Sequence, residues 1–300
     1  MLREQTLLGV HDKVADAIER LRHFEPRGGY YLCFSGGKDS QCIYHLAKEA
    51  GVRFDAHYNI TGVDPPELVY FIRKHYPDVH RELYKKSMRK LIEWKKWPPT
   101  RRSRYCCSEL KEFHGGNRFC VTGVRWSESV NRKKNRGIVE VLATSGKKQD
   151  NLIFNFEGEV EHVGDACNAS GKKVLNPIVD WETEDVWEYL NSRNIPHCCL
   201  YNEGFTRLGC IGCPMGGTHQ MEKEFEIWPG FKKYYLRAFE KAIEHRKESG
   251  LKCTWDRAEQ MMDWWIYGQD KNKEKEVSGQ IYMFGDDYNV EWRGRDGRSD

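Results

Sequence analysis

Tyr30-Tyr31-Leu32-Cys33-Phe34-Ser35-Gly36-Gly37-Lys38-Asp39-Ser40 is the stretch that decides the fold. Its first five residues are apolar and predict a buried strand, and the helix-like run from Gln41 to Ala50 follows the glycine pair. Gly36 and Gly37 allow the backbone to turn with positive φ and to approach an anion closely. The amides of the next helical turn, together with the helix dipole, supply positive potential. The stretch therefore predicts a phosphate-binding loop between a strand and a helix.

The polar side chains of this loop fit the same interpretation. Lys38 adds a positive charge, and Ser35 and Ser40 add short hydroxyl donors. Asp39 is poorly suited to bare phosphates, so we interpret it as a holder of Mg²⁺ or of the loop itself. The spacing differs from the common nucleotide loop, which places four residues between its first glycine and its Gly-Lys pair.

Length and composition limit the possible classes of protein. The chain has 300 residues, 39% of them hydrophobic, which suffices for one large domain or one domain with an appendage. We find no apolar run near 18 residues and no signal-peptide pattern, and the first 24 residues read as an amphipathic helix. These features predict a soluble cytoplasmic protein that does not associate with a membrane.

Strand-like and helix-like segments alternate through the first two thirds of the chain. This rhythm predicts an α/β fold with a doubly wound, mostly parallel sheet, whose ligands lie at the carboxyl ends of the strands. The predicted strands are 30–34, 53–58, 81–84 and 119–123, and the predicted helices are 39–50, 66–76, 87–97 and 181–193. After Met221 the pattern is helical as far as Tyr267.

The predicted domain organisation follows from these patterns. Residues 1–28 form an N-terminal helix, and 29–215 form a nucleotide-binding domain with an inserted hairpin or lid near 138–175. Residues 216–269 form a helical part, and 270–300 form an irregular tail.

Cysteine provides the second constellation. Eleven cysteines in a cytosolic chain indicate metal ligation or redox chemistry rather than disulfides. The pair Cys106-Cys107 and the turn Cys210-Ile211-Gly212-Cys213 offer four soft ligands, enough for a [4Fe–4S] cluster or a tetrahedral Zn²⁺. Neighbouring side chains do not readily reach one small ion, whereas the irons of a cubane are spread over several ångströms. Geometry therefore favours iron–sulfur over zinc.

The loop resembles the pyrophosphate loop of the adenine-nucleotide α-hydrolase superfamily, which has a HUP-type fold. Members typically bind ATP, cleave it between the α- and β-phosphates, and adenylate an oxygen on a second substrate. Further blocks resemble the phosphoadenylyl-sulfate (PAPS) reductase branch in order, so that the resemblance covers Gly29 to Met215. They are Thr61-Gly62-Val63-Asp64-Pro65-Pro66-Glu67, Val121-Thr122-Gly123-Val124-Arg125 with Glu128-Ser129, Asn176-Pro177-Ile178-Val179-Asp180-Trp181, and Pro196 to Cys210.

The four cysteines resemble the signature of adenylyl-sulfate reductases, in which all four ligate a [4Fe–4S] cluster. Two departures separate this chain from those reductases. Their phosphate loop is usually degraded, whereas Ser35 to Ser40 is intact. They also end in a Glu-Cys-Gly-x-His segment whose cysteine attacks sulfur, and nothing here matches it, because the last cysteine, Cys253, lies in Lys252-Cys253-Thr254-Trp255.

The resemblance implies a set of site residues. Lys38, with Arg125 or Arg207, would neutralise charge on a departing pyrophosphate. Glu128 and Asp64 would contact Mg²⁺ or ribose, or act as a cap or turn residue. The implied nucleotide-binding residues are Ser35, Gly36, Gly37, Lys38, Asp39, Ser40, Thr61, Gly62, Gly123, Arg125 and Glu128; the implied catalytic residues are Lys38, Asp39, Arg125 and Arg207; and the implied metal ligands are Cys106, Cys107, Cys210 and Cys213.

The formal net charge of +3 does not identify a polyanion-binding protein, but its distribution is uneven. Between Tyr84 and Arg104, Glu93 is the only acid among the cations Lys85, Lys86, Arg89, Lys90, Lys95, Lys96, Arg101, Arg102 and Arg104. Such a run receives phosphates or forms a solvated helix face.

Three functional hypotheses follow. The first is an ATP pyrophosphatase-type adenylating enzyme with an iron–sulfur cluster, acting on sulfur or nucleic acid in sulfur transfer. The second is an adenylyl-sulfate or phosphoadenylyl-sulfate reductase that releases sulfite. The third is a non-catalytic nucleotide- or nucleic-acid-binding module. The candidate partners are an adenine nucleotide (ATP or adenylyl sulfate), a nucleic acid such as tRNA or DNA, a thiol or sulfur-donor protein, and a second copy of the chain.

Overall fold

The computed structural model describes residues 1–6, 9–112, 115–116, 118–142, 152–154 and 171–268. These residues form two compact units that interleave along the chain. The sheet unit consists of Met1–Ile60, Asp64–Tyr84 and Leu110–Gly209. The helical unit consists of Thr61–Val63, Lys85–Glu109 and 210–268.

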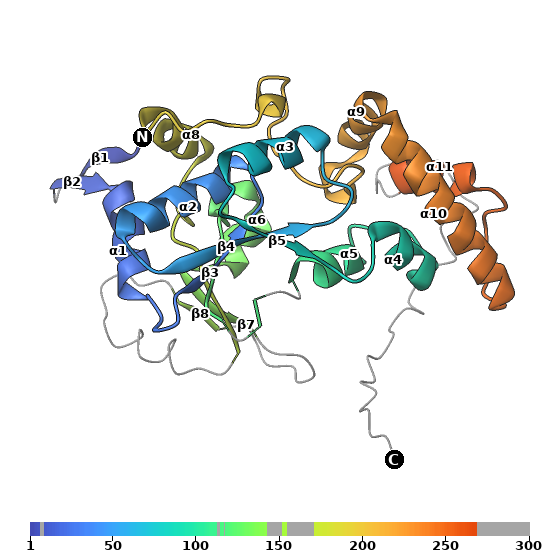
Figure 1. The fold of residues 1–300 in the computed structure, drawn as a ribbon, viewed down its shortest axis with the longest axis horizontal. Helices are drawn as coiled ribbons and strands as arrows, with labels where there is room; N and C mark the ends of the chain where they lie inside the picture. The colour runs from blue at the N-terminus through green and yellow to red at the C-terminus, as the bar shows by residue number, and fades with distance from the viewer. Residues whose placement is uncertain (7–8, 113–114, 117, 143–151, 155–170, 269–300) are drawn as a thin grey trace, which may run out of the picture. The chain divides into compact units, whose positions relative to one another are not determined.

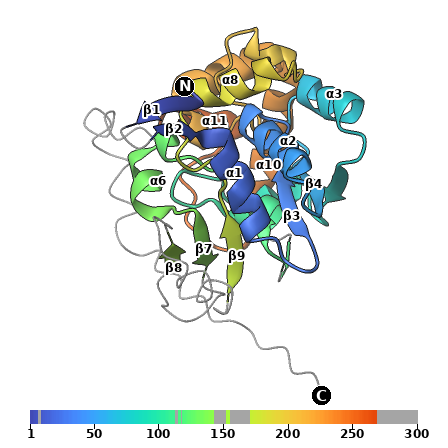
Figure 2. The same ribbon diagram turned by 90° about the vertical axis from the view of Figure 1, so that its left-hand side faces the viewer.

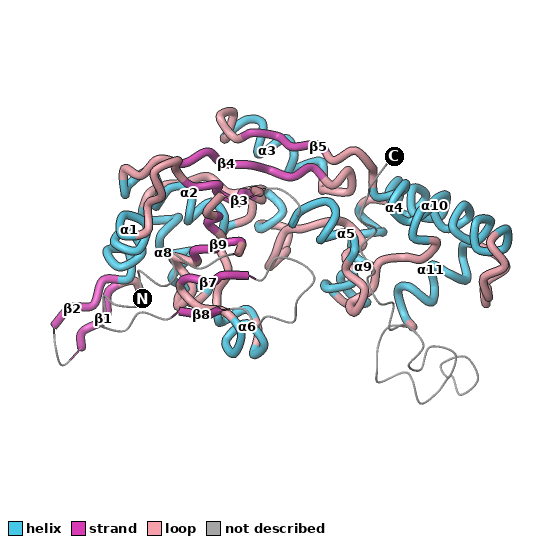
Figure 3. Tube along the Cα trace, turned by 90° about the horizontal axis from the view of Figure 1, so that it is seen from below, coloured by secondary structure: helices cyan, strands magenta, loops and turns pink. Residues whose placement is uncertain are grey.

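The sheet unit is built on a seven-stranded sheet with the order β5-β4-β3-β6-β9-β7-β8 (Figure 3). Its parallel strands are β3 (Tyr30–Phe34), β4 (Phe54–Ile60), β5 (His80–Leu83), β6 (Cys120–Val121) and β9 (Lys172–Leu175). The antiparallel strands β7 (Val139–Leu142) and β8 (Leu152–Phe154) extend one edge. The carboxyl ends of the five parallel strands therefore meet at one edge of the sheet.

Strand β3 lies between β4 and β6, and its side chains are almost completely buried, with Tyr30 and Leu32 at 0% exposure. A central parallel strand is covered on both faces and reads as a continuous apolar run. Helices α1 (Lys13–His23) and α8 (Thr183–Ser192) both pack against α2 (Lys38–Ala50). Figure 2 shows α1 and α2 side by side near β3. The remaining helices of this unit are α3 (Pro66–His75) and α6 (Val130–Asn135), with the short helices η2 (Trp126–Glu128) and η3 (Cys199–Tyr201).

The helical unit is organised around α10 (Pro229–Glu248), the long helix in Figure 1. It packs against α4 (Met88–Lys95), α9 (Thr218–Ile227) and α11 (Ala258–Tyr267). Tyr235, Phe239 and Trp265 form its buried aromatic core, with the Tyr235 and Trp265 ring centroids 4.8 Å apart. Cys106 and Cys107 lie in the short helix α5 (Tyr105–Cys107). The short helix η4 (Pro214–Gly216) follows Cys213. A π-helical turn, Ser108–Glu112, follows α5. Among the described helices, none is both long and apolar enough to cross a membrane.

This architecture confirms the predicted doubly wound, mostly parallel sheet with a helical C-terminal part. The strand predicted at 119–123 is shorter, because only Cys120–Val121 pairs with both neighbours before Gly123 turns toward the backbone of Asp39. The region near 138–175 contributes β7, β8 and β9 to the main sheet. The rest of that insertion and the predicted tail at 270–300 lie outside the described residues.

The prediction of one helix across the first 24 residues was wrong. Residues Arg3–Thr6 (β1) pair with Gly9–Asp12 (β2) as antiparallel strands, and the helix begins only at Lys13. Asp12 fixes this start, because its carboxylate accepts hydrogen bonds from the amides of Val14 and Ala15. Such a cap satisfies amide groups that have no partner within the helix. The amphipathic pattern belongs to the part of the segment that follows the cap.

Arg118 joins the segment before β6 to β4. Its guanidinium donates to both carboxylate oxygens of Asp55, at 2.5 and 2.6 Å. The hydrogen bond from Arg118 lowers the pKa of Asp55 to about 2, below its ordinary value of 3.8. An aspartate with a lowered pKa in the folded state stabilises the fold above its unfolded pKa and loses this contribution as the pH falls.

We expect Asp55→Asn to reduce the free energy of unfolding at about pH 6, and the difference from wild type to shrink between about pH 4 and about pH 2. Denaturant unfolding across this range measures the difference. Asp256→Asn, at a carboxylate that is 88% exposed, is the matched control and should show no such trend. A difference that stays constant down to about pH 2 would contradict the assignment.

Candidate active site

The loop from Ser35 to Ser40 is closed by its own hydroxyl groups. Ser40 Oγ donates to the carbonyl of Gly37 at 2.9 Å, and the hydroxyls of Ser35 and Ser40 lie 3.1 Å apart. Gly36 has φ = 72°, and a Cβ there would lie 2.7 Å from the Ile72 side chain. Glycine is therefore required at this position, both by the left-handed backbone and by the close approach of α3.

Lys38 is buried, with 5% exposure, and is held at both ends. Its amide donates to Tyr201 Oη at 2.9 Å, and its Nζ donates to the carbonyl of Thr206 at 3.2 Å. Burial raises the pKa of the Tyr201 hydroxyl, so this group stays neutral. The Tyr201 hydroxyl is thus the hydrogen-bond partner of an amide that we predicted to bind an anion. Tyr201 was missed as a site residue, although it lies in the quoted block from Pro196 to Cys210.

Arg125 is the most buried cation at this loop, with 2% exposure. Its Nε donates to Asp39 Oδ1 at 2.7 Å, and its Nη1 donates to Ser127 Oγ at 2.8 Å and to the carbonyl of Trp181 at 3.2 Å. The other oxygen of Asp39 lies 3.4 Å from Lys38 Nζ. Because both of its oxygens face cations, Asp39 holds the loop in this structure, and its surroundings do not fit the predicted Mg²⁺ site.

Gly123 lies against the first turn of α2. A Cβ at this position would lie 2.9 Å from the carbonyl oxygen and 3.0 Å from the carbonyl carbon of Asp39. Both are backbone atoms and have no freedom to rotate away. The segment after β6 therefore needs glycine in order to bring Arg125 to Asp39.

The remaining residues predicted for the sheet unit differ in their surroundings. The Glu128 carboxylate accepts a hydrogen bond from the Arg125 amide at 3.1 Å and pairs with Arg132, which is the geometry of a cap. Asp64 is buried. Arg207 is exposed and follows Thr206, whose carbonyl holds Lys38; within the described residues its side chain has no hydrogen bond or ion pair.

Thr61 and Gly62, which we predicted to bind the nucleotide, belong to the helical unit. The Thr61 side chain is buried, and its Oγ1 accepts hydrogen bonds from the amide of Val63 at 3.3 Å and from the Cys210 thiol at 3.5 Å. Thr61 is therefore grouped with the cysteine turn.

The four cysteines predicted as ligands all lie in the helical unit. The amide of Cys213 donates to the carbonyl of Cys210 at 3.2 Å, which closes the turn between them. The pKa of the Cys106 thiol is raised by a hydrogen bond with Cys107, by burial, and by the charges of Cys107, Cys210 and Cys213. The four sulfurs thus share one electrostatic environment. Among the described residues, no three His, Cys, Asp or Glu side chains form a group that could hold a metal ion.

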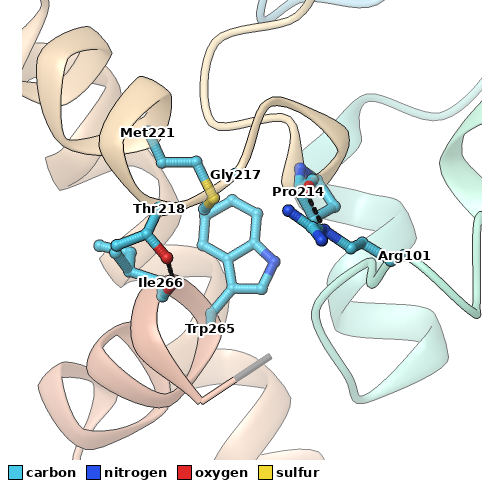
Figure 4. A pocket seen from close by; sticks show the side chains of 7 residues that line it. All are labelled: Arg101, Pro214, Gly217, Thr218, Met221, Trp265 and Ile266. Atoms are coloured by element: carbon cyan, nitrogen blue, oxygen red, sulfur yellow. Dashed lines mark hydrogen bonds between the residues drawn. The ribbon is translucent and has the colours of Figure 1, made fainter. Parts of the chain in front are cut away.

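The cysteine turn is braced on several sides. Gly212 has φ = 71°, its amide donates to Glu224 Oε2 at 2.6 Å, and a Cβ there would lie 2.7 Å from Phe225. Tyr235 Oη donates to the carbonyl of Ile211 at 2.9 Å. Figure 4 shows Arg101 reaching Pro214 beside the Trp265 indole, with Nε of Arg101 2.9 Å from the Pro214 carbonyl. This bond ties the segment before Cys106 to the residue after Cys213.

Comparison with known proteins identifies a family model and several relatives. The model of the phosphoadenosine phosphosulfate reductase domain matches residues 29–215. Two uncharacterised proteins of Methanocaldococcus jannaschii are 24% identical over 81% of this chain and 30% identical over 66% of it. The chain spans 53% and 39% of their lengths, about half or less. An adenosine 5'-phosphosulfate reductase of Staphylococcus haemolyticus is 22% identical, over 68% of this chain and 77% of its own.

Among solved structures, a phosphoadenylyl-sulfate reductase from Candida auris in complex with phosphate matches with a TM-score of 0.44 and 16% identity. The match covers 65% of this chain and 88% of that one.

We expect Gly123→Ala to destabilise the protein by about 1–3 kcal/mol, because the added methyl group meets backbone atoms that cannot move aside. Thermal or denaturant unfolding measures the loss. Gly28→Ala is the matched control, since a Cβ there meets nothing within 4 Å. Equal stability of the two variants would show that Gly123 is not closely packed against α2.

Proposed function

The chain belongs to the phosphoadenosine phosphosulfate reductase family, and from that premise we propose that it binds ATP on Ser35 to Ser40 and adenylates an oxygen of a second substrate for sulfur transfer. The observation that carries the proposal is the intact loop. Its hydroxyl groups close it, and within it Lys38 is buried, with its Nζ held by the Thr206 carbonyl. A helix N-terminus of this kind, with a fixed cation beside it, suits a chain of phosphates.

In the proposed reaction, the acceptor oxygen attacks the α-phosphorus and loses its proton to solvent. The bond between the α-phosphorus and the oxygen that bridges to the β-phosphate breaks, and pyrophosphate leaves with the electron pair. The Lys38 ammonium and the amides of the first turn of α2 stabilise the charge that grows on pyrophosphate. A phosphate oxygen at the Lys38 amide takes the place of the Tyr201 hydroxyl. We assign no step to Mg²⁺, because both oxygens of Asp39 are already engaged.

A sulfonucleotide reductase is the second candidate, and the adenosine 5'-phosphosulfate reductase relative favours it. In that reaction a thiolate attacks the sulfur of adenylyl sulfate, and AMP leaves with the electrons of the sulfur–oxygen bond. A dithiol protein of the thioredoxin class then reduces the resulting thiosulfonate and releases sulfite. Cys253 is the candidate thiol outside the quartet. It is partly buried, and its Sγ lies 3.1 Å from the carbonyl of Trp255.

Calorimetric titration distinguishes the two candidates. We expect ATP to bind at least about tenfold more tightly than AMP, and Lys38→Met to abolish this preference, because a charge-assisted contact to the terminal phosphates is lost. Lys48→Met, at the exposed end of the same helix, is the control. Preference for adenylyl sulfate over ATP, with thioredoxin-dependent sulfite release that Cys253→Ala abolishes, would favour the reductase.

We also propose that Cys106, Cys107, Cys210 and Cys213 hold a [4Fe–4S] cluster. The four thiols do not form a metal-holding group in the described structure. They do lie in one compact unit, on two segments joined by the Arg101–Pro214 hydrogen bond, and thiolates are the donors that such a cluster uses. A single zinc ion needs its ligands on one centre, whereas a cubane accepts a vicinal pair. When bound, such a cluster supplies one-electron redox chemistry. The chain's own contribution is to brace the turn at Gly212 and to keep the four thiols partly shielded from solvent.

Anaerobic purification followed by iron and acid-labile sulfide analysis tests this assignment. We expect about four of each per chain, and their loss in Cys106→Ala and Cys213→Ala. Cys199→Ala is the control, because Cys199 is exposed and lies in the sheet unit. Stoichiometric zinc without iron, or unchanged iron in both ligand variants, would contradict the assignment.

A further inference from the structure

Trp94 carries its indole on the surface of the helical unit, with 52% of the residue exposed. It lies in the last turn of α4, next to the buried residues Leu91 and Ile92. Trp97, three residues later, is packed instead: its ring centroid lies 5.0 Å from that of Trp255 and 4.9 Å from that of Trp264. The end of α4 is therefore anchored by Trp97, and the Trp94 indole remains available at the surface.

Positive charge surrounds this exposed ring. Lys86 Nζ lies 3.8 Å and Lys95 Nζ 4.1 Å from the centroid of the Trp94 ring. Lys90, one helical turn before Trp94, is exposed. Glu93 is the only acid between Tyr84 and Arg104, and its carboxylate lies 3.1 Å from Lys90 and 3.4 Å from Arg89. Within this segment the cations therefore outnumber the acid.

We propose that this surface, formed by Lys86, Lys90, Trp94 and Lys95, binds a single-stranded polynucleotide. A base stacks on the Trp94 indole, and the flanking phosphates are received by the lysines. Stacking of a base on an indole contributes more free energy than an exposed ammonium resting on the same ring. The base therefore displaces an ammonium, and a neighbouring phosphate receives it.

The combination of groups identifies the class of ligand. Bases within a duplex stack on one another, whereas unstacked bases are free to stack on an exposed aromatic ring. A free nucleotide brings one phosphate group or chain, whereas here two ammonium groups lie against the indole and Lys90 lies one helical turn away. An acidic protein segment would satisfy the charges without using the ring. A single strand satisfies both the ring and the charges.

The surface adjoins the cysteine quartet within the helical unit. Lys95 Nζ also lies 5.9 Å from the centroid of the Tyr105 ring, and Tyr105 immediately precedes Cys106. This step rests on the proposed function: it identifies the substrate that accepts the adenylyl group as a polynucleotide.

Fluorescence anisotropy of labelled oligonucleotides of about 12 residues, with the full chain and no ATP, tests the surface. We expect Trp94→Ala to weaken binding of a single strand by about 5- to 100-fold and Trp94→Phe to retain most of it. Lys86→Ala should reduce the slope of log affinity against log salt by about 0.7. The matched controls are Tyr70→Ala and Lys74→Ala on α3, where Tyr70 is 68% exposed.

RNA and DNA strands are compared in parallel, and the tighter of the two identifies the polymer. Equal affinity of wild type and Trp94→Ala would overturn the proposal. Equal binding of duplex or of polyglutamate would also overturn it, since neither uses the ring. The anisotropy assay contains no ATP. If the wild-type protein showed no preference for ATP over AMP in the calorimetric test, the proposed function would be excluded, but the measured oligonucleotide binding would not change.

Discussion

The ion pair between the buried Arg125 and the partly buried Asp39 is the interaction on which the loop edge of the sheet unit depends. Arg125 is 2% exposed, so its guanidinium has almost no access to water and relies on Asp39, Ser127 and the Trp181 carbonyl. Removing one partner of a buried pair leaves an uncompensated charge, which typically costs about 3–5 kcal/mol. Through this one guanidinium, the segments that follow β6 and β9 are joined to the first turn of α2.

The same pair determines the electrostatics of the loop. Asp39 lies between Arg125 and Lys38, so two fixed cations share one carboxylate at the N-terminus of α2. The surplus charge adds to the positive end of the helix dipole. Since Lys38 is also held by the Thr206 carbonyl, a phosphate would meet a cation that is already positioned. Such preorganisation is favourable because little rearrangement is needed when charge develops.

Local sequence patterns predicted the main sheet well, because each strand and helix there carries its own signal. Strand β3 matches its predicted range completely, and α2 begins one residue earlier than predicted. The N-terminal hairpin was missed, since an amphipathic pattern does not show where Asp12 caps the helix. The contact of Tyr201 with the Lys38 amide spans 163 positions and leaves no local trace. The grouping of Thr61 with Cys210 is equally non-local, at 149 positions.

The basic run between Tyr84 and Arg104 illustrates why composition alone does not describe a surface. Arg101 serves the fold, because it donates to the Pro214 carbonyl next to the cysteine turn. Lys96 donates to Ser249 Oγ at 2.5 Å, and Arg89 faces Glu93. Charges on a surface are largely screened beyond about 8 Å at physiological salt. Cations close to one another therefore act together on a ligand, and Lys86 and Lys95, which both rest on the Trp94 ring, are such a pair.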